Sequence, residues 1–279
     1  MEYCFDLVGK IGSMALIRKE DQEIDYNIIS RLGADLKPGM IWVTSGATEI
    51  GRLDYIKRTG RELNGDPEQD KTDYSAQGQA ILMQNYRQFI RPEYGVRQIL
   101  VEHTHFNDPE KREHIRQLLI RAAQQRTIPI INYNDPVSDE ENRKMELAAR
   151  RQMGGEVHEC VDNDETAAVI AGLVKAKMLV LMTSTEGIYR EKGNPDSLVR
   201  EVTGKTFEEV EKKVRELQQS CIGASRAGAN GARAKLEYAL GCVRGGTMVV
   251  IGHARHHLSD LVEGRVACTR IGVENGTIW

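Results

Sequence analysis

Short apolar runs alternate along the chain with longer amphipathic segments. The runs are rich in Val, Ile, Leu and Met and have no polar face, which is typical of strands buried on both sides of a sheet. Six such strands are predicted, over residues 5–8, 40–44, 98–101, 128–132, 178–182 and 247–251. In the segments between them, apolar residues recur at the spacing of one helix face. Six helices are predicted there, over residues 24–36, 74–90, 109–125, 165–175, 207–218 and 232–243.

This alternation of strand and helix predicts an α/β fold. Strands joined by crossover helices form a mostly parallel sheet that is covered on both faces. Two segments interrupt the rhythm. Residues 135–156 are polar and charged, and are expected to form a long excursion or a helical insert, either as a solvated surface or as a flap over a binding site. Residues 190–206 are rich in Gly, Asn, Pro and Asp and are predicted to form a loop.

The composition is that of an ordinary globular protein, with 279 residues, 40% of them hydrophobic and 28% charged. A chain of this length can bury one large core or two closely joined halves. The net charge of −3 gives no global cationic field, so neither nucleic acid nor an anionic membrane is expected as the main partner. No apolar stretch approaches the ~20 residues that span a bilayer, and the first apolar run is too short for a signal peptide. We therefore expect a cytoplasmic protein.

The cysteines are far apart, odd in number and never in a CxxC pair. This pattern favours reduced thiols over a disulfide framework or a zinc site. They are Cys4, Cys160, Cys221, Cys242 and Cys268.

Glycines gather where predicted strands end, which is the edge at which open α/β sheets bind ligands. The chain lacks the P-loop, dinucleotide-binding, zincin and serine-hydrolase motifs that would otherwise explain them. The run Gly9-Lys10-Ile11-Gly12-Ser13 offers backbone N–H groups and one lysine to a phosphate, although a plain surface turn has the same features. The run Thr44-Ser45-Gly46-Ala47 opens a helix whose N–H groups suit a carboxylate or phosphate, although an ordinary N-cap explains it equally well.

Three later segments carry further candidate groups. Asn132, Asn134 and Asp135 offer amides and a carboxylate to an amine or hydroxyl, although Asn-Asp-Pro is also common in turns. The run Asp162-Asn163-Asp164 begins a helix and holds more acids than capping needs, so the second acid could position lysines or hold magnesium. The glycine-rich turn of residues 228–231 enters a helix with Lys235 one turn inside, as in an anion site, although a helical lysine is usually only solvated.

Taken in order, these motifs resemble the glutamate 5-kinase family of amino-acid kinases over nearly the whole chain. Lys10-Ile11-Gly12-Ser13 resembles the lysine-glycine-serine opening of that family, and Ser45-Gly46-Ala47 resembles its serine-glycine-alanine turn. The other similar segments are Gly51-Arg52, Ala76-Gln77-Gly78-Gln79, the run from Pro129 to Asp135, Asp162-Asn163-Asp164, Thr183 with Gly187-Ile188-Tyr189, and the glycine turn before Lys235.

The resemblance implies an αβα sandwich that transfers the γ-phosphoryl group of ATP to the side-chain carboxylate of L-glutamate, the first step of proline synthesis. It implies that Lys10 and Lys235 hold the transferred phosphate and that Asp164 orients both lysines as the third catalytic residue. The substrate-binding residues it implies are Ser45, Gly46, Ala47, Asp135 and Asn163. The nucleotide-binding residues it implies are Lys10, Gly12, Ser13, Thr183, Ser184, Gly187, Tyr189, Gly231 and Lys235. Mg²⁺ is expected to accompany ATP without protein ligands being assigned, and a homodimer or homotetramer is expected.

The resemblance also implies one amino-acid-kinase domain over residues 1–279. Its acceptor-binding part is expected at about residues 1–160 and its nucleotide-binding part at about residues 161–279, without a C-terminal domain of the RNA-modification type.

Three departures from the family pattern motivate two alternatives. Ser184 stands where the family has aspartate, Ala229-Asn230-Gly231-Ala232 replaces threonine-glycine-glycine-methionine, and the segment between Asp135 and Asn163 is longer. The first alternative is a kinase of the same fold acting on another small carboxylate, phosphate or phosphonate. The second is a nucleotide-binding regulator without turnover.

Overall fold

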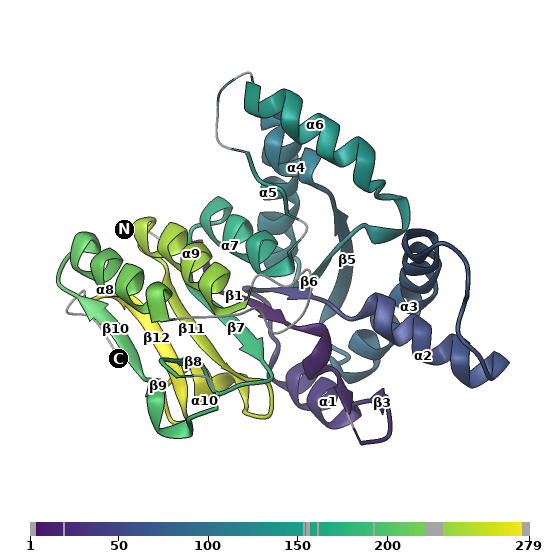
Figure 1. The fold of residues 1–279 in the computed structure, drawn as a ribbon, viewed down its shortest axis with the longest axis horizontal. Helices are drawn as coiled ribbons and strands as arrows, with labels where there is room; N and C mark the ends of the chain where they lie inside the picture. The colour runs from purple at the N-terminus through teal and green to yellow at the C-terminus, as the bar shows by residue number, and fades with distance from the viewer. Residues whose placement is uncertain are drawn as a thin grey trace.

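The computed structural model describes residues 4–18, 20–152, 154, 157–160, 162–191, 193–220 and 231–274. The strands of its central sheet are β1 (Phe5–Ile11), β4 (Met40–Thr44), β5 (Gly95–Val101), β6 (Thr127–Tyr133), β7 (Ala176–Thr183), β10 (Glu201–Gly204), β11 (Met248–His253) and β12 (Cys268–Val273). Their order in space is β10-β12-β11-β7-β1-β4-β6-β5 (Figure 1). Neighbouring strands are parallel except β11 and β12, which are antiparallel. The mostly parallel sheet predicted from the sequence is therefore confirmed.

Strand β1 lies at the centre of the sheet and fixes where its two halves meet. Lys10 near the end of β1 pairs with Val43 of β4 on one side and with Leu181 of β7 on the other. The strands that precede residue 160 lie on the β4 side of β1, and those that follow it lie on the β7 side. Because β1, β4, β6, β7 and β11 run in the same direction, their carboxyl ends share one edge of the sheet, and side chains from distant parts of the sequence meet there.

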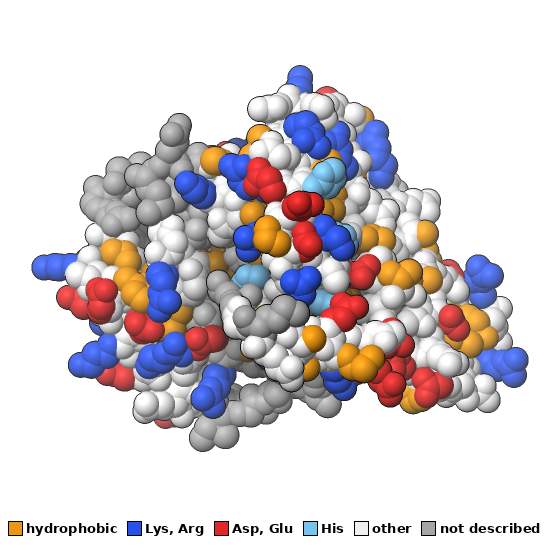
Figure 2. Space-filling model, turned by 90° about the horizontal axis from the view of Figure 1, so that it is seen from above, with side chains coloured by type: hydrophobic (Ala, Val, Ile, Leu, Met, Phe, Trp, Pro, Cys, Tyr) orange, Lys and Arg blue, Asp and Glu red, His pale blue; other side chains and the backbone are white. Residues whose placement is uncertain are grey.

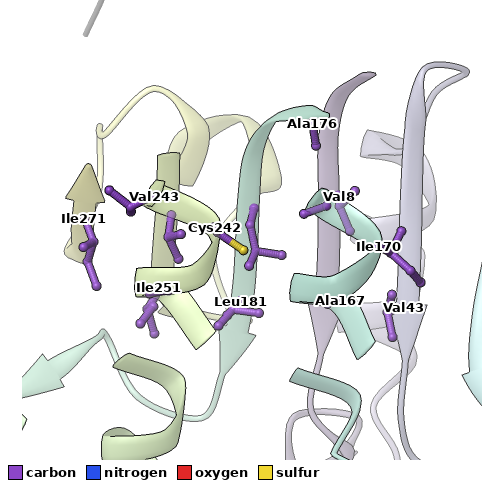
Figure 3. Close-up of a cluster of buried hydrophobic side chains, with 14 of the residues drawn as sticks. Val8, Val43, Ala167, Ile170, Ala176, Leu181, Cys242, Val243, Ile251 and Ile271 are labelled. Atoms are coloured by element: carbon purple, nitrogen blue, oxygen red, sulfur yellow. The ribbon is translucent and has the colours of Figure 1, made fainter. Parts of the chain in front are cut away.

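Helices cover both faces of the sheet, which confirms the αβα sandwich. One face packs against α1 (Tyr26–Asp35), α2 (Ala47–Thr59), α3 (Pro67–Phe89) and α10 (Leu258–Val262). The other face packs against α4 (His103–Asn107), α5 (Pro109–Gln124), α7 (Asn163–Leu173), α8 (Phe207–Ser220) and α9 (Gly231–Arg244). Figure 3 shows the centre of this second core, where Ala167 and Ile170 of α7 and Cys242 of α9 face apolar side chains of the strands. Among the described residues, no helix combines the length and apolar character needed to cross a membrane.

Several helices begin where the sequence places an aspartate before a proline or a polar turn. Asp66 accepts hydrogen bonds from two N–H groups of the first turn of α3, and Pro67 follows it. Asp108 and Pro109 start α5 in the same way. An N-cap carboxylate satisfies N–H groups that have no helical partner, and proline fits the first helical position. Helix α3 therefore begins at Pro67 and not at residue 74, because its first turns are stabilised by capping and carry little apolar periodicity.

Two strands of the sheet were not predicted. Strand β10 lies within residues 190–206, so the prediction of a loop there is wrong in its second half. Strand β10 is four residues long, lies at the sheet edge and pairs with β12 alone, so it carries no long apolar run. In β12 the polar pair Thr269 and Arg270 interrupts the apolar pattern. Near the other end of the chain, Glu23–Ile24 forms a small hairpin, β3, with β2 (Ile17–Arg18), so α1 begins after the predicted residue 24.

The charged insert contains a helix, α6 (Glu140–Gln152), that packs beside α4 (Figure 1). Leu147 is buried, and Glu146 Oε2 lies 2.8 Å from His103 Nε2. Arg150 Nη1 donates to the carbonyl of Asn107 at 2.8 Å. The helical insert expected from the sequence is therefore confirmed, and its middle is docked beside α4, whereas a flap over the binding site stays a prediction.

Helices α2 and α3 cross with their backbones in contact. A Cβ added at Gly51 would lie 1.8 Å from the carbonyl oxygen of Tyr74, and one added at Gly78 would lie 1.8 Å from that of Ala47. No side chain fits at either position without moving one helix. The two glycines of the family-like segments therefore have a packing role, one on each helix.

We predict that Gly78→Ala destabilises the fold by about 1–3 kcal/mol or more, because the new methyl group can be accommodated only by separating α2 from α3. Urea unfolding measures the loss. Gly172→Ala is the matched control, because Gly172 is exposed on α7 and a Cβ there meets no atom within 4 Å. The control should gain up to ~1 kcal/mol from helix propensity. Equal stability of Gly78→Ala and the wild type would contradict the proposed backbone contact.

Candidate active site

A buried carboxylate joins two lysines at the carboxyl edge of the sheet. Asp164 is 2% exposed, and its Oδ1 lies 2.6 Å from Lys10 Nζ while its Oδ2 lies 2.7 Å from Lys235 Nζ. The three residues come from β1, the first turn of α7 and the first turn of α9. The fold thus brings together the three residues that the sequence motifs suggested for phosphoryl transfer.

The electrostatics of this cluster favour the arrival of an anion. Burial opposes ionisation of Asp164, but the ammonium groups of Lys10 and Lys235 outweigh it and hold the pKa of Asp164 below its ordinary value. Asp162, two residues earlier, has its pKa raised by burial and by the charge of Asp164. Each ammonium group contacts one oxygen of Asp164 and has three N–H donors, so donors remain for phosphate oxygens.

The glycine turn after β1 leaves space beside Lys10. The N–H of Gly12 donates to the carbonyl of Met182, so this group belongs to the sheet and is not turned toward a ligand. A Cβ at Gly12 would lie 3.7 Å from Lys10 Nζ. Because Gly12 has no side chain, the space next to the ammonium group of Lys10 stays open. Ser13 begins the short helix η1 (Ser13–Ala15) that follows.

Asn163 is the centre of a second polar cluster, one residue away from Asp164. Its Nδ2 lies 3.0 Å from three acceptors, namely the carbonyl of Thr44, Ser45 Oγ and Asn132 Oδ1. Gly46, next to Ser45, has φ of 103° and precedes the first residue of α2, Ala47. Only glycine adopts that backbone conformation without strain, so Gly46 sets the direction in which α2 leaves the site.

Two backbone groups fix the orientation of the amides in this cluster. The carbonyl of Thr44 can only accept, so Asn163 must present its NH₂ group there and keep Oδ1 free. The N–H of Tyr133 donates to Asn132 Oδ1, so Asn132 turns its NH₂ group toward Gln79 Oε1, at 2.8 Å. The buried Asn163 Oδ1 and Gln79 Nε2 have no hydrogen-bond partner among the described residues. A buried polar group without a partner costs about 1–3 kcal/mol, which a substrate group could recover.

Asp135 lies in η2 (Asp135–Val137), directly after β6, and is held by a lysine that the sequence did not point to. Lys71 Nζ, from α3, is 3.2 Å from Asp135 Oδ1. Asn134, between β6 and η2, donates from Nδ2 to Glu102 Oε1 at 2.9 Å. Of the proposed substrate residues, Ser45 and Asn163 are therefore in contact, whereas Asp135 contacts Lys71.

On the other side of β1, the loop after β7 carries the residues suggested for the nucleotide. Thr183 Oγ1 accepts from the N–H of Thr185, and Ser184 is exposed. Gly187 is required by packing, because a Cβ there would lie 2.3 Å from Thr269 Oγ1. Tyr189 follows in β8 (Ile188–Tyr189), which pairs with β9 (Leu198–Val199).

Glu186 in the same loop was missed by the sequence analysis. It forms an ion pair with Arg255, and its Oε2 lies 2.7 Å from His256 Nε2; both partners follow β11, so Glu186 joins the loops after β7 and β11. These three residues carry no sequence motif, and only the sheet order makes them neighbours.

Part of the second predicted anion site lies outside the described residues. Gly228, Ala229 and Asn230 are in the segment that the structure does not describe. Gly231 begins α9 with φ of 61°. Of the five cysteines, Cys4, Cys160, Cys242 and Cys268 are free thiols, and Cys221 lies outside the described residues. Burial raises the pKa of the Cys242 thiol to about 12, which opposes a nucleophilic role.

The residues present fit a nucleotide triphosphate better than a protein-held metal ion. Lys10 and Lys235 could bind phosphate oxygens, with Gly12 leaving room beside them. The described part of the chain contains no group of three His, Cys, Asp or Glu side chains placed to hold a metal. Mg²⁺ would therefore be held chiefly by phosphate oxygens, as is common for this ion. Figure 2 shows one face of the molecule, on which Lys and Arg side chains are interspersed with Asp and Glu.

The chain has an α/β fold in which Lys10, near the end of β1, and Lys235, on α9, share Asp164. The chain belongs to the amino acid kinase family, whose model matches residues 7–253. Membership supports ATP-dependent phosphoryl transfer to a small molecule as the class of reaction.

Among known proteins, several glutamate 5-kinases are similar in sequence to this chain. The protein of that name from Gloeobacter violaceus (strain ATCC 29082 / PCC 7421) is 30% identical over 276 residues, which is 96% of this chain and 68% of the relative. That from Streptococcus suis (strain 05ZYH33) is 29% identical over 255 residues, covering 88% of this chain and 63% of the relative. Glutamate 5-kinase 2 from Bacillus subtilis (strain 168) is 30% identical, covering 83% of this chain and 57% of the relative. The family resemblance drawn from the motifs is thus confirmed, and the chain spans about three fifths to two thirds of the length of these relatives.

Solved structures with the same fold are more distant in sequence. A carbamate kinase from Giardia lamblia bound to AMP-PNP superposes with a TM-score of 0.58 at 11% identity, covering 96% of this chain and 98% of that one. An isopentenyl phosphate kinase in its substrate complex superposes with a TM-score of 0.56 at 16% identity. The match covers 96% of this chain and 99% of that one. These similarities establish the fold, and their acceptors differ from one another.

We predict that Asp162→Asn stabilises the folded protein at neutral pH. The pKa of Asp162 is higher in the folded protein than in the unfolded chain, so the folded protein favours the protonated carboxyl. The stability that this preference contributes is complete below the unfolded-state pKa. That contribution is lost as the pH rises through the folded-state pKa. Asparagine keeps the cap, since its oxygen can still accept from the N–H of Asp164, and it removes the repulsion. Urea unfolding at about pH 7 should show the gain, and the gain should shrink toward about pH 4.

The control for this prediction is Asp108→Asn. Asp108 also caps a helix, but its pKa is lowered, chiefly by hydrogen bonding to the N–H of Lys111. Replacing it should therefore give no gain at neutral pH. A loss of stability in Asp162→Asn equal to that in the control would contradict the assigned repulsion between Asp162 and Asp164.

Proposed function

We propose that the protein transfers the γ-phosphoryl group of ATP to the side-chain carboxylate of L-glutamate, giving γ-glutamyl phosphate and ADP. The observation that carries the proposal is the sharing of buried Asp164 by Lys10 and Lys235. The polar cluster around Asn163 lies directly beside it and suits a small polar acceptor. Sequence similarity to glutamate 5-kinases supports glutamate as that acceptor.

The mechanism needs positioning and charge neutralisation more than acid–base chemistry. An oxygen of the acceptor carboxylate forms a bond to the γ-phosphorus, and the bond from that phosphorus to the bridging oxygen of ADP breaks. No proton has to be removed, because a carboxylate is already a nucleophile. Lys10 and Lys235 neutralise charge on the transferred group, and Asp164 keeps their ammonium groups in place. Mg²⁺, bound with ATP, would neutralise further phosphate charge.

The two halves of the sheet suggest a division of labour. In this proposal residues up to about 160, with Ser45, Gly46, Ala47 and Asp135, hold the acceptor. Residues from about 161 onward hold ATP through Thr183, Ser184, Gly187, Tyr189, Gly231 and Lys235, with Lys10, Gly12 and Ser13 from β1 and its turn. Asn163 and Asp164, at the start of α7, lie where the two halves meet. As part of the same proposal, the enzyme works in the cytoplasm at the first step of proline synthesis and assembles as a homodimer or homotetramer.

A kinase of the same fold with another small acid as acceptor is the second candidate. The long segment that contains α6 favours it, because this segment begins at Asp135 and ends at Asn163, both proposed acceptor contacts. A regulator without turnover is opposed by the contact of Lys10, Asp164 and Lys235, which a binding protein would not need.

Incubation with Mg-ATP and a panel of acids tests the function. L-Glutamate should stimulate ADP release more than aspartate, acetate, carbamate or phosphate esters. Added hydroxylamine should trap the acyl phosphate as a hydroxamate, which distinguishes product formation from ATP hydrolysis. Preference for another acid would support the second candidate, and no stimulation by any acid would favour the regulator.

We expect Lys10→Ala and Lys235→Ala each to lower kcat by about 10²–10³-fold, with smaller changes in KM, because their charges matter most as negative charge redistributes on the phosphoryl group. Steady-state kinetics with the preferred acid measure this. Lys213→Ala is the control, since Lys213 on α8 contacts only the carbonyl of Thr203 among the described residues. A kcat within twofold of wild type in Lys235→Ala would remove that residue from the mechanism.

A further inference from the structure

Helix α6 carries an arginine, Arg143, that faces the end of β6 and forms no ion pair within the described residues. Arg143 Nη1 lies 3.2 Å from Ser138 Oγ, and Ser138 Oγ lies 3.2 Å from the hydroxyl of Tyr133, the buried last residue of β6. Arg143 is half-buried, and the described part of the chain contains no ion pair to it. Glu140, one turn earlier on α6, is instead paired with Lys144. Most of the donors of this guanidinium are therefore available to a ligand.

Arg143 and Lys71 approach the same short segment from opposite elements. Lys71, on α3, contacts Asp135, and Arg143, on α6, contacts Ser138 only three residues further on. Asp135 is itself three residues from Asn132, whose Oδ1 contacts Asn163. The segment contacted by Lys71 and Arg143 therefore follows the Asn163 cluster directly along the chain.

The charges on this segment match those of an α-amino acid head. Asp135 offers one carboxylate, and Lys71 and Arg143 offer two cations. Lys144, and then Arg143 and Lys71, also lower the pKa of the exposed Glu140 carboxylate, which Lys144 pairs. An ammonium group would replace Lys71 as the partner of Asp135, and a neighbouring carboxylate would then meet Lys71 and the planar fork of Arg143. Guanidinium groups bind carboxylates with two parallel hydrogen bonds, which fixes orientation as well as position.

We propose that Arg143 and Lys71 bind the α-carboxylate of the acceptor while Asp135 binds its ammonium group, so that the site selects an amino acid with a second carboxylate. This inference rests on the proposed function, whose acceptor is a small acid. It gives α6 a role in specificity through one side chain, while the remainder of that helix stays docked on α4.

Binding measured by calorimetry, with a non-hydrolysable ATP analogue present, tests the assignment without relying on turnover. The ligands are L-glutamate, glutarate, which lacks the ammonium group, and 4-aminobutyrate, which lacks the α-carboxylate. Arg143→Gln should lower the affinity for glutamate and for glutarate by about tenfold or more. Its affinity for 4-aminobutyrate should stay within twofold of that of the wild type. Lys71→Met should show the same selectivity. Asp135→Asn should show a different selectivity: its affinity for glutamate and 4-aminobutyrate should fall, and its affinity for glutarate should not change.

Arg150→Gln and Lys57→Met are matched controls. Arg150 lies two turns along α6, is also half-buried and has one hydrogen bond, to Asn107. Lys57, on α2, lies 3.2 Å from Glu23, the same separation as in the Lys71 pair. Both controls should bind all three ligands as the wild type does, and melting temperatures should show that every variant is folded.

Each outcome of the binding experiment decides the inference. Unchanged glutamate and glutarate binding in folded Arg143→Gln overturns it and leaves the proposed function in place. If the wild type binds a different dicarboxylate and not glutamate, the proposed acceptor is wrong. The inference then stands only if Arg143→Gln lowers the affinity for that acid and leaves unchanged the affinity for its analogue with one carboxylate fewer. Binding of no acid by the wild type overturns both.

Discussion

The site depends on one buried carboxylate, Asp164, that is shared by two ammonium groups. Removing one partner from a buried ion pair commonly costs about 3–5 kcal/mol, so β1, α7 and α9 are tied to one another by charge as well as by the apolar core around them. Each ammonium group uses one contact on Asp164 and keeps further N–H donors. Stability and phosphate binding therefore have the same source, because the carboxylate that joins the three elements also positions two ammonium groups toward an incoming phosphate.

Much of the fold could be predicted because a parallel sheet buries its strands on both faces. The strands at 40–44 and 178–182 are continuous apolar runs, and their positions were correct to within two residues. Strand β10 was not predicted, because an edge strand with one partner needs few apolar residues and has no apolar run. The first turns of α3 were missed for a different reason. Asp66 and Pro67 start that helix by capping, before its apolar pattern begins. Helix α6 was left open between loop and helix, because its attachment to the fold depends on Leu147 and a few polar contacts.

The cluster of Lys10, Asp164 and Lys235 could be anticipated from motif order, but its neighbours could not. Lys10 is the last residue but one of β1, and Asp164 and Lys235 lie in the first two turns of α7 and α9. Strand direction brings such positions to one edge of the sheet. Lys71 lies inside a helix, where polar residues are usually only solvated, and nothing in the sequence distinguishes it from other surface positions. Gln79 lies in a family-like segment, but no role was assigned to it from the sequence. Their relevance comes from contacts with Asp135 and Asn132 across the gap between α3 and β6. Such pairings depend on how two elements pack, which local sequence does not encode.

The backbone contact between α2 and α3 bears on how substrate preference can evolve. Ser45 and Gly46 lead into α2, and Gln79 lies on α3, so both helices lead to the Asn163 cluster. Because the backbones of these helices touch at Gly51 and Gly78, enlarging either glycine would displace the two helices together. Helix α6 is attached through buried Leu147 and a few polar contacts, so most of its residues can be exchanged one at a time. Divergence in acceptor choice among proteins built in this way should therefore accumulate first on α6, the module that can vary without disturbing the rest.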